Sequence, residues 1–282
     1  MFSDILLTAD FDRTLTAPDS AIPQRNLDAI RWFLDNGGTF TVNTGRSVPM
    51  SKRNIIPCVP VNAPLLLYNG SGAYDTEKGE MTLCRPLPLD PDVVKQVQEA
   101  FPDLNVEIQA VDAHYLVRRN AGWEDYCANN GCAWRYLEPR EIPGPFLKFS
   151  VYGQFRENTV ASMYQATEAE LARFEEAIRY IEENFGDRVD VFRACARIAD
   201  IHAKGCSKLR AARDLQRRLG KKVLICVGDA ENDLPMLEGA DYAFCPSDGV
   251  VADRFENVCE CAEGAVADVI YKKIPALLKN KP

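Results

Sequence analysis

Two carboxylates at alternate positions follow an apolar run near the start of the chain. Asp10 and Asp12 come directly after residues 5–9, in the stretch Asp10-Phe11-Asp12-Arg13-Thr14. Two carboxylates about 4 Å apart repel each other by roughly 4 kcal/mol at an effective dielectric of 20, so a fold that keeps them together needs a cation or a shared proton. A solvated turn with an aspartate cap is the alternative, and this pair alone does not decide between the two.

Further polar residues follow other apolar runs. Asp229 and Asp233 come after one such run, and Thr44 and Gly45, which offer a hydroxyl and an unobstructed backbone N–H, come after another. Oxygen ligands at this density suit a hard divalent cation, and Mg²⁺ is typically held by one or two carboxylates together with substrate phosphate. The pattern therefore indicates a magnesium site.

Lys208 begins a stretch with helical spacing, in which Leu209, Ala212, Leu215 and Leu219 form the expected core face. A lysine at the start of a helix is opposed by the helix dipole, so we expect an anion near its ammonium. A solvated lysine is the alternative.

The apolar runs at both ends of the chain predict the elements that position these residues. Short strands are expected at 5–9, 40–42, 65–68, 223–227 and 243–245. They are apolar on both faces, which is typical of a parallel sheet covered by helices. Polar residues at the ends of such strands meet at one edge of the sheet, where open α/β sheets place their sites.

The middle of the chain predicts a different module. Helical patterns occupy 90–100 and 171–185, the second opened by a capping box, and strand pairs are expected at 104–110 with 114–117 and at 189–192 with 197–201. Strands with helices on one face indicate an α+β module inserted into the α/β domain. We expect residues 1–82 and 200–282 to form the α/β core and residues 83–199 to form the insertion.

Four motifs together resemble the haloacid dehalogenase superfamily, and within it the Cof-type phosphatases with a class IIB cap. They are DxDxT at Asp10–Thr14, TGR at Thr44–Arg46, KGxSK at Lys204–Lys208 and GDxxND, which contains Asp229 and Asp233. The resemblance covers nearly the whole chain. It implies a Rossmann-like parallel-sheet core for the chemistry and an α+β cap that closes over the substrate.

The resemblance also implies a role for each residue. Asp10 is expected to be the nucleophile that forms an aspartyl-phosphate, and Asp12 the general acid and base. The expected ligands of Mg²⁺ are the Asp10 carboxylate, the Asp12 backbone carbonyl, Asp229 and Asp233. The expected phosphate-binding groups are Thr44, the Gly45 amide, Lys208 and Asn232.

The implied activity is Mg²⁺-dependent hydrolysis of a phosphomonoester of a small metabolite, such as a sugar phosphate. Asp12 argues against a dehalogenase, because carbon–halogen cleavage needs no proton for a leaving alkoxide. A phosphomutase of the phosphomannomutase type and a catalytically silent phosphate-binding protein stay open as alternatives. Arg13 stands where the family more often has glycine, and it either pairs with an acid or reaches a substrate group.

Specificity residues are expected in the cap, where side chains suited to a polar ligand are His114, Arg118, Arg119, Trp123, Tyr126, Trp134, Arg135 and Lys148. Each of them also has an ordinary explanation as a surface or packing residue. The sequence does not name the substrate.

Composition limits the partners and the compartment. The chain has 33 Lys and Arg against 41 Asp and Glu, a net charge of −8, which disfavours non-specific binding to nucleic acid or anionic membranes. The ten cysteines form no CxxC pair and are expected to be reduced thiols, and the two histidines lie too far along the chain from any cysteine pair to indicate a zinc knuckle. No signal peptide, membrane span or protein partner is evident, so we expect a cytoplasmic protein.

Overall fold

The computed structural model describes residues 1–119, 121–129, 131–153, 167–195 and 197–279. The chain divides into two compact units. The first, which we call the parallel-sheet unit, comprises Met1–Gly45, Cys58–Leu83 and Ser207–Pro282. The second, the mixed-sheet unit, comprises Arg46–Pro57 and Cys84–Cys206, so most of it is inserted between two parts of the first.

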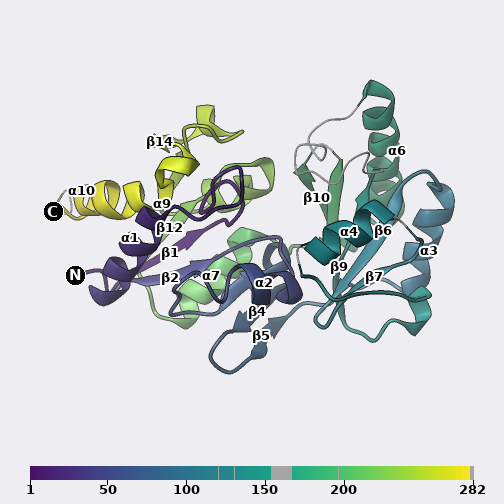
Figure 1. The fold of residues 1–282 in the computed structure, drawn as a ribbon, viewed down its shortest axis with the longest axis horizontal. Coiled ribbons are helices and arrows are strands. Elements are labelled where there is room, and N and C mark those ends of the chain that lie inside the picture. Colours follow the sequence, from purple (N-terminus) through teal and green to yellow (C-terminus); the bar gives the residue numbers. More distant parts are fainter. Residues whose placement is uncertain (120, 130, 154–166, 196, 280–282) are drawn as a thin grey trace. The chain divides into compact units, whose positions relative to one another are not determined.

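A five-stranded sheet forms the centre of the parallel-sheet unit, and both chain termini belong to this unit (Figure 1). Every neighbouring pair of strands is parallel, as the apolar runs predict. In spatial order the strands are β14 (Glu256–Val258), β13 (Tyr242–Pro246), β12 (Val223–Val227), β1 (Ile5–Ala9) and β2 (Thr39–Val42).

Helices cover this sheet because both faces of its central strands are apolar. Leu6, Leu224 and Cys226 pack in one cluster with residues of two helices, α7 (Lys208–Arg218) and α8 (Leu234–Glu238). The alternate residues of the same strands, such as Leu7, are buried as well. The other helices of the unit are α1 (Gln24–Asp35), α9 (Ala265–Asp268) and α10 (Ile274–Lys279).

Two sequence expectations in this unit are wrong. Leu219 does not lie on the core face of α7, since the helix ends at Arg218 and the Leu219 side chain is 37% exposed. The strand β3 (Leu65–Leu67) does not join the parallel sheet as a full strand. It touches that sheet through one parallel bridge, Asn43 to Leu66, and forms its own three-stranded sheet with β4 (Gly72–Asp75) and β5 (Glu80–Cys84).

The mixed-sheet unit is built on a six-stranded sheet. Its strand pairs are antiparallel except for one parallel pair at the edge. In spatial order they are β10 (Val189–Cys195), β11 (Ile198–Ala203), β9 (Phe146–Tyr152), β6 (Asn105–Ala110), β7 (His114–Leu116) and β8 (Trp134–Tyr136). Both expected strand pairs are confirmed, and so is the fold class of an α/β core with an inserted α+β module.

Among the described residues of this unit, α3 (Pro91–Ala100) and α6 (Glu168–Phe185) cover one face of the sheet. The helix α4 (Ala121–Asn129) packs with Leu116 and Tyr152, which alternate with residues of the first face, and therefore lies on the other side. A further helix, α2 (Val48–Asn54), belongs to the same unit. The predicted capping box at the start of α6 is present.

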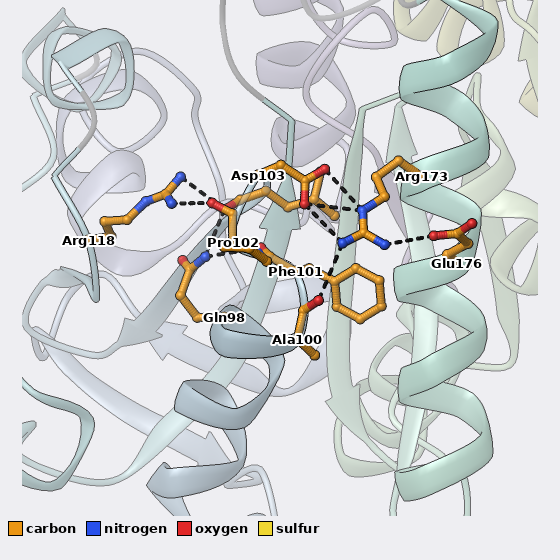
Figure 2. Close-up of polar contacts among 9 residues, drawn as sticks. Gln98, Ala100, Phe101, Pro102, Asp103, Arg118, Arg173 and Glu176 are labelled. Carbon is orange, nitrogen blue, oxygen red and sulfur yellow. Dashed lines mark hydrogen bonds and ion pairs between the residues drawn. The ribbon is translucent and has the colours of Figure 1, made fainter.

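The loop between α3 and β6 is held by two arginines, one on α6 and one in the segment that follows β7 (Figure 2). The Arg173 guanidinium on α6 lies over the Phe101 ring, 4.6 Å from its centroid, and donates to the Asp103 carboxylate at 3.0 Å. Arg118 donates to the Pro102 carbonyl. These contacts fasten the loop to α6 within the unit. Among the described residues, no helix has the length and hydropathy that crossing a bilayer requires.

Candidate active site

The carboxyl ends of three neighbouring strands bring the predicted site residues together in the parallel-sheet unit. Asp10 follows β1 directly, and its N–H donates to the Val227 carbonyl at the end of β12 at 2.9 Å. On the other side of β1, the Asn43 N–H donates to the Ala9 carbonyl at 2.9 Å. The loops after β1, β2 and β12 therefore start at one edge of the sheet.

Three carboxylates from these loops form a buried cluster. One oxygen each of Asp10, Asp229 and Asp233 lies within 4.8 Å of the other two. All three residues are buried, and Asp233 has no exposed surface. The structure thus brings together the residues that the sequence analysis expects to share a metal ion.

Lys208 faces this cluster from the first turn of α7. Its Nζ lies 2.7 Å from Oδ1 of Asp10 and 2.7 Å from Oδ1 of Asp233, and the residue is 1% exposed. The start of α7 is fixed by the Ser207 hydroxyl, which caps the helix, and by the Asn43 side-chain amide, which donates to the Lys208 carbonyl at 2.9 Å. The expected anion near the ammonium is therefore present, as two carboxylates.

The buried cluster has more negative charge than the Lys208 ammonium can balance. The pKa of Asp10 is raised from 3.8 to about 7, chiefly by desolvation. The Lys208 ammonium offsets part of this increase, and the nearby Asp233 and Asp12 carboxylates add to it. Burial and the Asp233 and Asp10 charges likewise hold the pKa of Asp229 well above its ordinary value. One lysine thus does not neutralise the carboxylates, and a further cation would stabilise their ionised forms.

Backbone and hydroxyl donors orient the acidic side chains. Oδ2 of Asp233 accepts from the N–H groups of Asp229 at 3.0 Å and Ala230 at 3.1 Å. The Thr14 hydroxyl donates to Oδ1 of Asp229 at 2.8 Å. Thr14, the last residue of the DxDxT motif, thus positions Asp229, a task that the motif alone does not reveal.

Glycine is required at the turn that follows β12. A Cβ atom at Gly228 would lie 2.6 Å from Cγ of Asp233, closer than carbon atoms approach one another. The same holds after β2, where a Cβ atom at Gly45 would lie 2.9 Å from Oδ1 of Asn69. Two of the motif glycines therefore permit close packing of the loops around the carboxylates.

The remaining predicted site residues lie in the same loops. Thr44 is buried after β2, where its N–H donates to the Leu66 carbonyl at 2.9 Å. Asp12 is half-buried and close enough for its charge to raise the pKa of Asp10. Asn232 is half-buried in the 3₁₀ turn Glu231–Asp233, one residue before Asp233. Arg13, in a left-handed conformation with φ of 57°, lies 4.0 Å from Oδ2 of Asp248, so its guanidinium faces an acid.

Several expected specificity residues are engaged inside the mixed-sheet unit. The Lys148 ammonium lies 2.8 Å from Oδ2 of the buried Asp200. The Trp123 ring stacks between the rings of Tyr126 and Tyr152. Arg118 holds the α3–β6 loop (Figure 2). These contacts explain the side chains as parts of the unit's own packing, which is the ordinary explanation that the sequence left open.

The carboxylate cluster fits a magnesium ion. It offers three buried carboxylates, which are hard oxygen ligands of the kind that Mg²⁺ prefers, and their charge exceeds that of Lys208. A soft metal would prefer sulfur or imidazole ligands instead. The fit rests on the donor set and on the uncompensated charge.

A family model for haloacid dehalogenase-like hydrolases matches residues 7–252 of this chain. Among curated proteins, the chain is 25% identical over 279 residues to an HMP-PP phosphatase of Serratia proteamaculans, an alignment that covers 93% of this chain and 92% of that protein. It is 24% identical over 258 residues to a 5-amino-6-(5-phospho-D-ribitylamino)uracil phosphatase of Bacillus subtilis, covering 88% of each chain.

The fold also has solved counterparts. The chain superposes on a HAD subclass IIB sugar phosphatase with a TM-score of 0.73, at 15% sequence identity, over 94% of this chain and 97% of that one. At this identity the likeness concerns the fold, which includes both the parallel-sheet core and the inserted module.

Proposed function

The chain belongs to the haloacid dehalogenase-like hydrolase family as one of its phosphatases, and we propose that it hydrolyses a small phosphorylated metabolite through an aspartyl-phosphate formed on Asp10. The observation that carries this proposal is the buried cluster in which Lys208 contacts Asp10 and Asp233. In this proposal residues 1–82 and 200–282 form the catalytic core, and residues 83–199 form a class IIB cap that selects the substrate.

Asp10 and Asp12, which lie in the loop after β1, have different roles in the proposed reaction. An Asp10 carboxylate oxygen attacks phosphorus while the bond from phosphorus to the leaving oxygen breaks, and Asp12 gives its proton to that oxygen. Asp12 then takes a proton from a water molecule, which attacks the phosphorus of the aspartyl-phosphate and releases phosphate from Asp10. The half-buried position of Asp12 beside Asp10 supports this division, because a proton carrier needs access both to the substrate and to water.

The phosphoryl group needs positive charge and hydrogen-bond donors during both steps. We assign this task to the Lys208 ammonium, the Thr44 hydroxyl, the Gly45 N–H and the Asn232 side chain. The carboxylates of Asp10, Asp229 and Asp233 and the Asp12 backbone carbonyl would hold Mg²⁺. When bound there, the ion neutralises negative charge on the carboxylates and on the transferred phosphoryl oxygens.

The relatives support the proposed substrate class, since they are phosphatases named for HMP-PP and for a phosphorylated ribitylaminouracil. A protein described as a sugar phosphatase shares the fold. We therefore propose a small polar metabolite with a terminal phosphoryl group.

The test is phosphate release at neutral pH with Mg²⁺ from HMP-PP, from 5-amino-6-(5-phospho-D-ribitylamino)uracil and from common hexose phosphates. The Asp10→Asn variant, which keeps the shape of the side chain and loses its nucleophile, is the matched control. We expect release that disappears in Asp10→Asn and in the presence of a chelator.

Three results would contradict the proposal. Activity that survives in Asp10→Asn would assign the nucleophile to another residue. Phosphate binding without turnover of any ester would favour a silent binder, and transfer of phosphate within a sugar, dependent on a bisphosphate activator, would favour a phosphomutase.

A further inference from the structure

Three side chains with soft metal-binding atoms lie together inside the mixed-sheet unit. The two cysteines have no task in the proposed function, and His114, a candidate specificity residue by sequence, is buried beside them. One ligand atom each of His114, Cys127 and Cys132 lies within 4.8 Å of the other two. The residues are 1%, 0% and 6% exposed, respectively. Two buried thiols and an imidazole at this separation match the ligand types of protein zinc sites.

Backbone hydrogen bonds hold the two cysteines together. Cys127 lies near the end of α4, and the chain turns back at Gly131, where φ is 64°. After this turn the Cys132 N–H donates to the Cys127 carbonyl at 2.9 Å. The two cysteines are spaced Cys-x₄-Cys, within the range that structural zinc sites use for a ligand pair.

The sheet brings the histidine to this pair from a distant part of the sequence. The His114 N–H donates to the Ala133 carbonyl at 2.8 Å, and His114 is the register partner of Trp134 in the parallel pair β7–β8. Ala133, the residue after Cys132, is thus hydrogen-bonded to the backbone of His114. Although His114 lies too far along the chain from a cysteine pair to indicate a zinc knuckle by sequence, it lies beside Cys127 and Cys132 in space.

Both ring nitrogens of His114 have polar partners that orient the imidazole. Its Nε2 lies 2.6 Å from the Ser47 hydroxyl, and its Nδ1 contacts the buried Glu107 carboxylate. Histidines that bind metals almost always have their second ring nitrogen held by an oxygen atom. Whichever nitrogen of His114 faces the cysteines, the other one retains such a partner.

We propose that His114, Cys127 and Cys132 bind a Zn²⁺ ion that fastens α4 to the β7–β8 edge of the sheet. Binding replaces the two thiol protons, which leave to solvent, with two Zn–S bonds, and no change of oxidation state is involved. The cluster supplies three of the four ligands of a tetrahedral zinc ion, and two oxygen donors, Glu107 and Ser47, contact His114.

The ligand types also separate this site from the carboxylate cluster. Mg²⁺ binds oxygen and has little affinity for thiolates, whereas Zn²⁺ and Co²⁺ accept them. A spectroscopic signal that needs sulfur ligands therefore reports on the cysteines alone, even if the metal also occupies the cluster of Asp10, Asp229 and Asp233.

The experiment is a Co²⁺ titration of the full chain after reduction and treatment with a chelator. We expect a thiolate-to-cobalt charge-transfer absorption that saturates as a single class of site and disappears when Zn²⁺ is added. Cys127→Ser and Cys132→Ser should each lose most of this absorption. Cys58→Ser and Cys84→Ser, which change exposed cysteines, are the matched controls and should keep it.

A second measurement needs no variant and so does not depend on the folding of the serine proteins. X-ray absorption at the zinc edge of the wild-type protein should show two sulfur ligands and at least one imidazole. An oxygen-only zinc environment, a cobalt spectrum without sulfur charge transfer, or a Cys127–Cys132 disulfide in the protein as purified would overturn the proposal. None of these outcomes depends on the phosphatase activity.

Discussion

The Lys208 ammonium lies 2.7 Å from Oδ1 of Asp10, although 198 residues separate the two in sequence. The same nitrogen lies 2.7 Å from Oδ1 of Asp233, so a single cation bridges the loops that follow β1 and β12. Its side chain is buried, and water does not screen these contacts. The ammonium therefore holds two carboxylates of the cluster together, and it is also a candidate for binding phosphate.

Replacing Lys208 should affect both stability and activity. Lys208→Met leaves Asp10 and Asp233 buried without their cation, which we expect to lower the free energy of unfolding by about 3–5 kcal/mol without Mg²⁺. Loss of the ammonium should lower kcat by about 10²–10³-fold, the usual effect of removing one donor to a transition state. Chemical denaturation and phosphate-release kinetics measure the two effects.

The control for that variant is Lys204→Met. Lys204 belongs to the same KGxSK motif, but its side chain is 56% exposed and pairs with Asp190 at the surface. An exposed ion pair contributes about 0–1 kcal/mol, so this variant should behave like the wild type. Equal losses in both variants would contradict the special position of Lys208.

Thr14→Val should weaken metal binding while it preserves side-chain shape. The Thr14 hydroxyl donates to Asp229, and groups that orient a metal ligand typically contribute about 10–100-fold to metal affinity. The concentration of Mg²⁺ that gives half-maximal activity should rise accordingly. Thr8→Val, at a buried threonine whose hydroxyl contacts the sulfur atoms of Cys226 and Met236, should leave this concentration unchanged. A similar shift in both variants would mean that the Asp229 contact is not the cause.

Mg²⁺ should stabilise the wild-type protein, and Asp229→Asn should reverse the order of stability with and without metal. Burial and the neighbouring carboxylates raise the pKa of Asp229, so its charge destabilises the metal-free protein at neutral pH. The variant should thus be at least as stable as the wild type in a chelator. With Mg²⁺ at 100 times its Kd, the wild type should gain about 2.7 kcal/mol and the variant much less. Thermal unfolding in both conditions measures the difference, and equal metal-dependent gains would contradict the assignment of Asp229 as a ligand.

His202 should make the protein less stable in mild acid. Burial lowers the pKa of His202 from 6.5 to about 3, helped by the Lys148 charge from β9 and opposed by Asp200 on its own strand and Asp190 on β10. Below pH 6.5 the unfolded chain therefore binds a proton that the native protein does not bind until about pH 3. The free energy of unfolding should fall in this interval by up to about 1.4 kcal/mol per pH unit from this residue.

The measurement that tests this is the slope of the free energy of unfolding against pH. This slope does not depend on the absolute stability of a variant. His202→Leu has no titrating group at this position, so its stability should change less steeply between pH 6.5 and pH 3. An unchanged slope would show that His202 is not the group responsible.

Much of the parallel-sheet unit could be predicted because its elements carry local signals. The apolar runs that form β1, β12 and β13 are short, continuous and bounded by turn residues, and such runs indicate buried parallel strands. In the mixed-sheet unit the helix α6 also has a local signal, because it begins at the capping box of Thr167 and Glu170, which is visible in four residues of sequence.

The strand β9 shows why the mixed-sheet unit was less predictable. All seven of its residues are buried, yet Lys148 and Ser150 interrupt the apolar pattern that would indicate a strand between two layers. Both polar side chains contact Asp200, which is supplied by the neighbouring strand β11. Burial of a lysine depends on a partner that local sequence does not reveal.

By itself, the sequence determined which side chains follow the apolar runs, and hence that carboxylates gather at one edge of a parallel sheet. Only the tertiary structure decided which of them meet: Lys208 with Asp10, the Thr14 hydroxyl with Asp229 across 215 residues, and His114 with Cys127 and Cys132. The reason is physical. A strand or helix is specified by neighbours a few residues away, whereas ion pairs and metal ligands are set by strand order and packing between segments far apart in the chain.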